Sequence, residues 1–235
     1  MIHRMTALLI IFAKEPRPGQ VKTRLSPPLS PQDTAQLYHN FLLDILEEMG
    51  QIPDLRLALA FSPPQAQRFF QGLAPPGSDL FPQEGKDLGE RMARAFDRGF
   101  EAGFGPILLR GSDTPDLPAT VVSEAREALA SGKAQVVLGP ATDGGYYLVG
   151  LTQPQPALFQ GPAWSGPTVM KDTLKLTRQQ GLKVHLLPSW SDIDTYADLL
   201  AFLRRARPAP QPGWRSRLGA MKLLGLDEEV EPGTV

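Results

Sequence analysis

A loop near the N-terminus concentrates positively charged side chains that suit a phosphate group. Lys14, Lys22 and Arg24 lie within residues 14–25, and Gly19 lets the backbone of the same loop approach a ligand closely. Lysine supplies a point charge and arginine a two-pronged donor, so the loop can surround a di- or triphosphate. On charge alone, an exposed loop without function is an equal alternative, because lysine and arginine are usually exposed.

A second candidate follows an apolar segment, residues 105–110, where Gly111, Ser112 and Asp113 come in succession. A carboxylate at the end of a buried strand suits Mg²⁺ or Mn²⁺, which prefer oxygen ligands and share them with substrate phosphates. We expect Asp113 to be the ligand and Asp116 to be a cap or turn residue of the helix that begins near residue 118.

A metal ion needs more than one carboxylate, and Asp192 and Asp194 follow another predicted strand. Asp194 is the candidate partner of Asp113, although it equally fits the N-cap of the helix that follows. Each aspartate is weak support alone. Together with the basic loop, they predict one phosphate and metal site.

A third candidate is the segment from Asp143 to Tyr147, which contains Gly144, Gly145 and Tyr146. Asp-Gly-Gly is typical of a tight turn between strands. The two tyrosines favour a further role, because aromatic rings at the edge of a sheet can stack on a sugar or a base.

These candidates require strands and helices that alternate along the chain, which predicts an α/β fold with three layers, Rossmann-like, around a mostly parallel sheet. In such folds, ligands bind beyond the C-terminal ends of the strands. Strands are predicted at residues 6–12, 55–61, 105–110, 134–138, 146–151 and 182–187. Helices are predicted at residues 32–49, 64–70, 118–131, 167–180 and 195–207, with one more that begins at Asp87 and is capped there by Asp87 and Glu90.

We expect one domain over residues 1–207, then a proline-rich linker and a tail with a short helix over residues 208–235. That helix, near residues 214–224, is expected to dock back on the domain rather than to contact a dimer partner or a membrane.

Composition excludes several classes of function. The net charge is −1, which gives no case for nucleic-acid binding. Without cysteine there is no thiolate chemistry, and the scattered histidines form no zinc site or catalytic triad. There is no P-loop and no G-x-G-x-x-G motif. No segment has the length and flanks of a membrane span or signal peptide, so we expect a cytoplasmic protein, either a monomer or a homodimer.

Taken together, these motifs resemble the nucleotide-diphospho-sugar transferase superfamily, which has the GT-A fold. Within it, the chain is most similar to a bacterial family of glycosyltransferase-like proteins linked to radical-SAM gene neighbourhoods and arsenosugar synthesis. The resemblance covers residues 6–205. It is carried by residues 12–14, 18–19, 22–25, 87–92, 111–115, 143–147 and 192–195. A more distant resemblance links residues 22–25 and 194–195 to phospholactate guanylyltransferase and CMP-sugar synthetases.

The resemblance implies a role for each matching position. Nucleotide phosphates would contact Lys14, Lys22 and Arg24 beside Gly19 and Ser112, and the base would lie near Gln83, Gly89 and Arg91. Asp113 and Asp194 would hold a divalent metal, Mg²⁺ or Mn²⁺. The acceptor or sugar would contact Asp143, Gly144, Gly145, Tyr146 and Tyr147, under a loop that contains Trp164, Ser165 and Thr168.

Three functions fit this set of residues. The first is transfer of a glycosyl group from a nucleotide sugar to a small acceptor, with Asp113, Lys22, Arg24 and Asp143 in the catalytic roles. The second is nucleotidyl transfer from a nucleoside triphosphate to a phosphorylated or hydroxyl small molecule with release of pyrophosphate, which would use the same residues. The third is a non-catalytic nucleotide-binding protein, which predicts loss of the acidic or basic residues that this chain retains.

Overall fold

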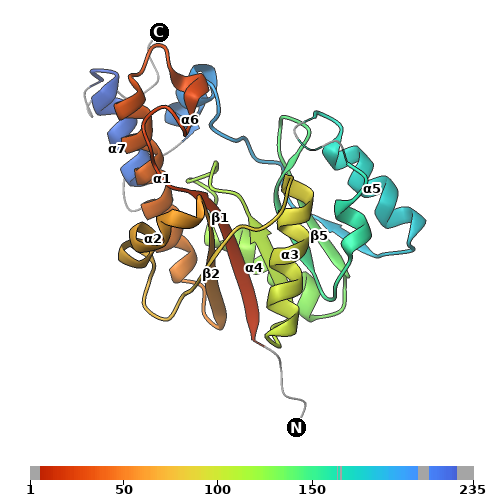
Figure 1. Ribbon diagram of the computed structural model, residues 1–235. Helices are drawn as coiled ribbons and strands as arrows, with labels where there is room; N and C mark the ends of the chain where they lie inside the picture. The colour runs from red at the N-terminus through yellow and green to blue at the C-terminus, as the bar shows by residue number, and fades with distance from the viewer. Residues whose placement is uncertain (1–5, 163, 165, 206–211, 227–235) are drawn as a thin grey trace.

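The computed structural model describes residues 6–162, 164, 166–205 and 212–226. Strands and helices alternate along most of the chain, as Figure 1 shows. The strands are β1 (Ala7–Lys14), β2 (Leu55–Ser62), β3 (Asp79–Pro82), β4 (Ile107–Arg110), β5 (Val136–Pro140), β6 (Tyr146–Leu151) and β7 (Val184–Leu186). The helices are α1 (Pro31–Gly50), α2 (Gln67–Leu73), α3 (Leu88–Glu101), α4 (Ala119–Ala130), α5 (Val169–Gln179), α6 (Tyr196–Arg205) and α7 (Trp214–Leu223).

The seven strands form one sheet in the order β3-β2-β1-β4-β6-β5-β7. All of them run parallel except β6, which is antiparallel to its neighbours β4 and β5. The chain adds β2 and β3 on one side of β1 and then returns to place β4 on the other side. The predicted α/β fold with a mostly parallel sheet is therefore confirmed.

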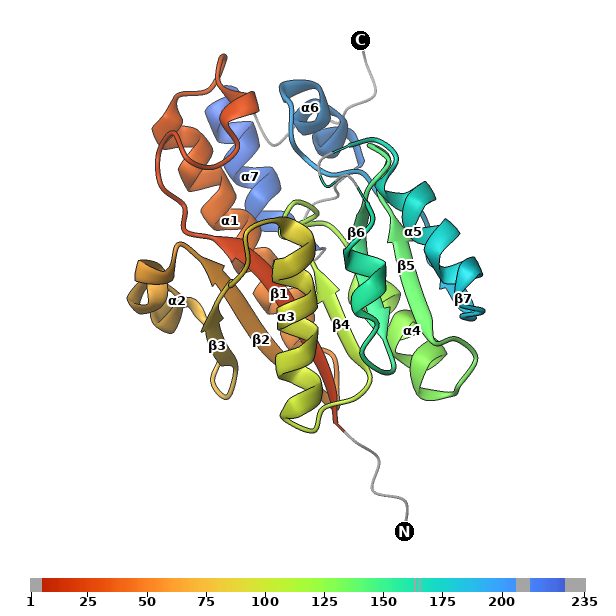
Figure 2. The ribbon, with the colours of Figure 1, turned by 45° about the vertical axis from the view of Figure 1, so that its right-hand side comes forward.

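Strand β1 is buried on both faces because it lies in the middle of the sheet. Leu9, Ile11 and Ala13 pack into a hydrophobic cluster with residues of α1, α2, α4, α6 and α7. The alternate residues, such as Ile10, pack into a second cluster with α3 and the segment around Phe159. Figure 2 shows α3 in front of the sheet and α4 behind it, which gives the predicted three layers.

Most predicted elements agree with the structure to within a few residues at their ends. Asp87 caps α3 as predicted, because its carboxylate accepts from the Glu90 N–H at 2.8 Å. The Glu90 carboxylate bonds back to the Lys86 N–H, one residue earlier than a capping box requires. The edge strand β3 was not predicted. Its four residues are too few to show a period, and Pro82 cannot donate to a neighbouring strand.

Helix α7 packs against α1 through a buried carboxylate. Asp44 on α1 is 4% exposed and accepts from the Ser216 N–H at 2.7 Å and from the Ser216 hydroxyl. It also accepts from the Arg215 N–H at 3.1 Å, so one carboxylate accepts hydrogen bonds from two backbone N–H groups in the first turn of α7. Residues 206–211, which contain most of the predicted linker, lie outside the described residues, and the predicted division into residues 1–207 and 208–235 stays a prediction. Among the described helices, none is long and apolar enough to cross a membrane.

We predict that Asp44→Ala destabilises the protein by about 2–3 kcal/mol, because it leaves the buried donors of Ser216 without an acceptor. The free energy of unfolding in urea measures this effect. Glu47→Ala is the matched control on the same helix: Glu47 is largely exposed and forms its ion pair, within the described residues, with Arg215, so its loss should cost less than about 1 kcal/mol. Equal effects of the two substitutions would contradict the assigned role of Asp44.

Candidate functional site

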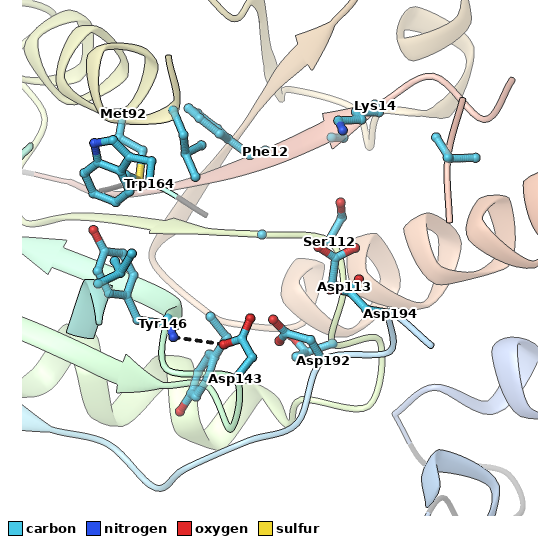
Figure 3. A pocket seen from close by; sticks show the side chains of 18 of the residues that line it. Phe12, Lys14, Met92, Ser112, Asp113, Asp143, Tyr146, Trp164, Asp192 and Asp194 are labelled. Carbon is cyan, nitrogen blue, oxygen red and sulfur yellow. Dashed lines mark hydrogen bonds between the residues drawn. The ribbon is translucent and has the colours of Figure 1, made fainter. Parts of the chain in front are cut away.

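A pocket of about 830 Å³ opens at the C-terminal ends of β1 and β4. The sheet order reverses between these two strands, which is where α/β sheets bind ligands. Many predicted site residues line it, namely Lys14, Lys22, Arg24, Gln83, Arg91, Ser112, Asp113, Asp143, Gly145, Tyr146, Tyr147, Trp164 and Asp194. Figure 3 shows Trp164 and Met92 at one end of the pocket and Asp113, Asp192 and Asp194 at the other.

The Lys22 ammonium forms the central contact of the charged end. It makes ion pairs with both Asp113 and Asp194, the second at 2.8 Å. Burial alone would lower the pKa of Lys22, but the charges of Asp113 and Asp194 outweigh it and raise that pKa. We assigned Lys22 to the nucleotide phosphates from the sequence. The structure instead pairs its ammonium with the two carboxylates that we expected to hold a metal.

Three loops meet at this ion pair. Lys22 precedes a 3-10 helix over Thr23–Leu25, Asp113 follows β4, and Asp194 lies between β7 and α6. The last two loops are also joined by a backbone hydrogen bond, from the Ile193 N–H to the Asp113 carbonyl at 2.9 Å. Lys22 and Asp194 are 172 residues apart in sequence, so a long-range contact joins their two loops at the site.

A buried arginine supports the loop that carries Asp113. Arg110, at the end of β4, is 1% exposed and donates to the Gly111 carbonyl at 3.1 Å and the Thr114 carbonyl at 2.7 Å. Burial lowers the pKa of this guanidinium to about 10, which leaves it charged at neutral pH. Sequence reasoning missed Arg110, because a charged residue that ends an apolar strand usually points to solvent.

Asp192 also belongs to the site, although the sequence favoured only its neighbour Asp194 as a ligand. It lines the pocket. Burial, together with the negative charges of Asp113, Asp143 and Asp194, raises the pKa of the Asp192 carboxyl to about 7. The Asp-x-Asp spacing was the available signal, since two aspartates in extended backbone near a sheet edge can both approach one ligand.

The charged end fits a divalent cation in its chemistry. Asp113 and Asp194 provide oxygen donors that already converge on one cationic atom, and both side chains are about two-fifths exposed. Within the described part of the chain, no group of three or more acidic or histidine side chains is arranged to hold a metal. A bound Mg²⁺ or Mn²⁺ would therefore need phosphate or water oxygens to complete its ligands, as is usual for magnesium.

Hydrogen bonds and ion pairs show whether Asp116 and Asp194 cap the helices that follow them. Asp116 does not cap α4 but lies in the turn before it, as the other half of the prediction expects, where the Leu117 N–H donates to the Thr114 carbonyl at 3.3 Å. The Asp116 carboxylate is buried, forms an ion pair with Arg205 at 2.6 Å and accepts from the Trp190 indole. Asp194 does not cap α6 either, because the Thr195 hydroxyl and the Asp198 carboxylate bond to each other's backbone N–H groups there. Asp194 is thereby left to face Lys22.

Of the remaining residues of the predicted phosphate site, Lys14, Arg24 and Ser112 line the pocket and Gly19 does not. Lys14 and Arg24 are exposed. Gly19 adopts a φ of 74°, so its role is to turn the loop rather than to contact a ligand in the pocket. Ser112 is buried, and its hydroxyl lies 2.6 Å from the Tyr38 hydroxyl, which also accepts from the Lys14 N–H.

The other end of the pocket is apolar and aromatic. Trp164 meets Tyr146 edge to face at 6.3 Å and stacks on Phe159 at 6.4 Å between ring centroids. Gly89 does not line the pocket, because α3 approaches so closely here that a Cβ would collide with Trp164 and the Phe159 carbonyl. Its predicted contact with the base is replaced by a packing role.

Gln83 and Arg91, which are predicted to lie near the base, both line the pocket. The Gln83 amide donates to the carbonyls of Ala13 at 3.3 Å and Ala60 at 2.8 Å, and so ties the ends of β1 and β2 together. Arg91 donates from Nε to the Gly85 carbonyl at 3.1 Å, which leaves the outer part of its guanidinium to face the pocket.

The predicted acceptor segment is partly a turn. Asp143 accepts from the Gly145 N–H at 2.9 Å, and Gly144, at a φ of 94°, packs against Pro167 outside the pocket lining. Tyr147 is 3% exposed and donates to the Pro188 carbonyl at 2.8 Å, so its ring face is not free to stack on a sugar. Residues 143–147 therefore form the tight turn and also contribute to the pocket lining.

One predicted residue of the loop over the acceptor, Thr168, does not line the pocket. The Thr168 hydroxyl donates to the Asp172 carboxylate at 2.8 Å in the first turn of α5. Ser165 lies outside the described residues.

The fold and the pocket together define a nucleotide-diphospho-sugar transferase-like protein. Residues 45–166 match a family described as "Uncharacterized protein conserved in bacteria" (DUF2064), and this chain belongs to that family. A crystal structure from Desulfovibrio desulfuricans G20, described as a "putative nucleotide-diphospho-sugar transferase", is 30% identical with a TM-score of 0.85. The match covers 94% of this chain and 97% of that one. A comparison with curated proteins finds no match.

More distant structures share only the fold. A CMP:2-keto-3-deoxy-manno-octonic acid synthetase in complex with CTP is 12% identical, with a TM-score of 0.54 over 83% of this chain and 96% of that one. A cytidylyltransferase from Leptospira borgpetersenii is 11% identical, with a TM-score of 0.52 over 94% of this chain and 93% of that one.

Asp192 should make the stability of the protein depend on pH. Its pKa rises from 3.8 to about 7 on folding, so the folded state retains a proton that the unfolded state releases. The contribution of this carboxyl to stability is therefore full below about pH 4 and is lost as pH rises through 7. We predict that Asp192→Asn raises the Tm by about 2 °C or more at pH 8, and by less at pH 5.

The melting curves are recorded with EDTA present, so that no divalent cation binds the neighbouring carboxylates. Glu127→Gln, which removes an exposed carboxylate on the outer face of α4, is the control and should show no such difference between the two pH values. An equal gain at pH 5 and pH 8 would show that Asp192 is ionised throughout this range.

Proposed function

We propose that this chain is a metal-dependent transferase that moves a glycosyl group from a nucleoside-diphosphate sugar to a small acceptor. The observation that carries the proposal is the division of one pocket at the sheet switch point into an aromatic end and a charged end. A nucleotide sugar has the same division, since it joins a flat base to a diphosphate.

The base would lie at the aromatic end, between Met92 and Trp164 and within reach of Arg91. The diphosphate would then extend toward Lys14 and Arg24, which are exposed at the other end and do not form the central ion pair. Positive side chains at this place stabilise the charge that develops on the nucleoside diphosphate as it leaves.

A divalent ion held by Asp113 and Asp194 would add positive charge beside the same phosphate oxygens. The bond between the sugar carbon and the diphosphate oxygen breaks, and the acceptor oxygen forms a new bond to that carbon. Asp143 is our candidate to take the acceptor's proton, because it lines the pocket and its carboxylate is oriented by the Gly145 N–H.

Nucleotidyl transfer is the second candidate, and the fold likeness to a synthetase in complex with CTP favours considering it. In that reaction an acceptor oxygen attacks the α-phosphorus, and pyrophosphate leaves with the electrons of the broken P–O bond. Lys22 and Arg24 would neutralise the phosphate oxygens, and an anionic acceptor would need no base. A nucleotide-binding protein without catalysis is the third candidate.

Thermal stabilisation by nucleotides separates these candidates, because a ligand that binds the folded state raises the Tm, and at equal concentration a tighter ligand raises it more. We expect nucleoside-diphosphate sugars with Mn²⁺ or Mg²⁺ to stabilise the protein most, and acceptor-dependent turnover to release a nucleoside diphosphate. Stabilisation chiefly by nucleoside triphosphates, with release of pyrophosphate, would support nucleotidyl transfer. Stabilisation without turnover of either kind would support the non-catalytic protein.

We predict that Asp113→Asn lowers the turnover number at least about 100-fold, because one carboxylate of the metal pair is lost where charge develops. The rate of nucleoside diphosphate release, measured at saturating Mn²⁺, tests this. Asp97→Asn, which removes a carboxylate on α3 outside the main pocket, is the control and should retain the rate. Unchanged binding and turnover in Asp113→Asn would overturn the proposed metal site.

A further inference from the structure

The position of Lys22 bears on how the charged end binds its ligands. Its side chain is 5% exposed, whereas those of Asp113 and Asp194 are 42% and 41% exposed. The ammonium therefore lies beneath the two carboxylates, with the Phe41 ring 5.9 Å away, and the carboxylates face the pocket. Lys22 serves as their counter-ion within the protein.

A divalent cation and the Lys22 ammonium compete for the same oxygens. Mg²⁺ lies about 2.0–2.1 Å from its oxygen ligands and requires nearly octahedral geometry. The ammonium contacts one oxygen of each carboxylate, Asp194 at 2.8 Å, so a cation that bridges these two oxygens would stand within repulsive contact of Nζ. Like charges this close repel each other and disfavour joint occupancy of the site.

The backbone conformation of Lys22 favours displacement of this residue from the two carboxylates. Its φ of 48° and ψ of 37° place it in the left-handed region, which non-glycine residues seldom adopt without support from their surroundings. The Lys22 carbonyl accepts from the Leu25 N–H at 2.9 Å and its side chain makes the two ion pairs, so loss of the ion pairs would remove one of these two supports.

A displaced Lys22 needs a new anionic partner. The adjacent side chains of the same loop that line the pocket, Lys14 and Arg24, are also cationic and would repel it. A polyphosphate bound between these residues would supply the missing negative charge.

We propose that Lys22 is an exchangeable counter-ion that leaves Asp113 and Asp194 when a divalent cation binds and then pairs with the phosphates of the nucleotide. The proposal rests on the function proposed above for its second half, the pairing with phosphate. It predicts that cation and nucleotide bind cooperatively, because the cation displaces Lys22 and the phosphates give the displaced ammonium a partner. Coupling between two such ligands is typically about 5- to 150-fold in affinity.

The first experiment measures binding of Mn²⁺ alone, from the electron paramagnetic resonance signal of free Mn²⁺. Lys22→Met keeps an unbranched stem to pack near Phe41 and removes the competing charge. We expect it to bind Mn²⁺ at least about fivefold more tightly than the wild type. Lys14→Met removes the same charge from the same loop without contact with either carboxylate and should change the affinity less.

The second experiment uses the wild-type protein and so does not depend on how a variant folds. Reductive methylation followed by peptide mass spectrometry reports which lysines are exposed. Lys22 should react slowly with EDTA present, faster with Mn²⁺, and slowly again with Mn²⁺ and a nucleoside diphosphate together. Lys133, which is exposed and does not line the pocket, is the internal reference. This measurement separates displacement of Lys22 from simple repulsion at a distance.

Weaker or unchanged Mn²⁺ affinity in Lys22→Met would overturn the proposal, and so would Lys22 labelling that Mn²⁺ does not accelerate. Both results are obtained without any nucleotide, so they are distinct from a failure of the proposed function. If Mn²⁺ exposes Lys22 but no nucleotide protects it again, the exchange stands and the pairing with phosphate is wrong.

Discussion

The ion pairs of Lys22 with Asp113 and Asp194 hold together the part of the molecule where the candidate site lies. Each of the three residues comes from a different loop, and each loop follows a strand of the same sheet. Two carboxylates that face one point would repel each other without a cation between them. The sheet brings the three loops to one edge, but the buried ammonium is what allows the two acidic loops to stay close. A cation of some kind is therefore a requirement of this arrangement.

The fold was largely predictable because its strongest signals are local. The run of apolar residues in β1 is long and buried on both faces, and α3 begins at a residue whose side chain can cap it. The short edge strand β3 was not predictable in this way. Its pairing with β2 depends on tertiary contacts, and four residues give no periodic pattern. The Asp-Gly-Gly turn between β5 and β6 is typical of a hairpin, so the antiparallel pairing of β6 with β5 had a local signal, whereas its pairing with β4 had none.

For the site, sequence indicated which side chains would gather at the sheet edge, but not which of them would pair. Asp113 and Asp116 both follow β4 closely, yet one faces the pocket and the other is buried against Arg205. Backbone direction over three residues decides this difference, and no residue type reveals it. Gly89, which was predicted near the base, lies outside the pocket lining for a related reason. A glycine in a motif can serve a ligand or a neighbouring ring, and here Trp164 takes the space.

The two chemistries that fit this pocket differ on the acceptor side rather than on the donor side. Both reactions need a flat aromatic end for a base and positive charge beside a phosphate chain. In glycosyl transfer, the acceptor's hydroxyl loses a proton, which calls for a carboxylate near the sugar. Asp143 and Asp192 both line the pocket, and Asp192 has its pKa raised to about 7 by burial and by neighbouring negative charge. An anionic acceptor would be repelled by these carboxylates unless cations neutralise them, whereas a neutral hydroxyl would not. The concentration of acidic side chains on this side of the pocket therefore favours a neutral acceptor, which is the kind of acceptor that the proposed glycosyl transfer would use.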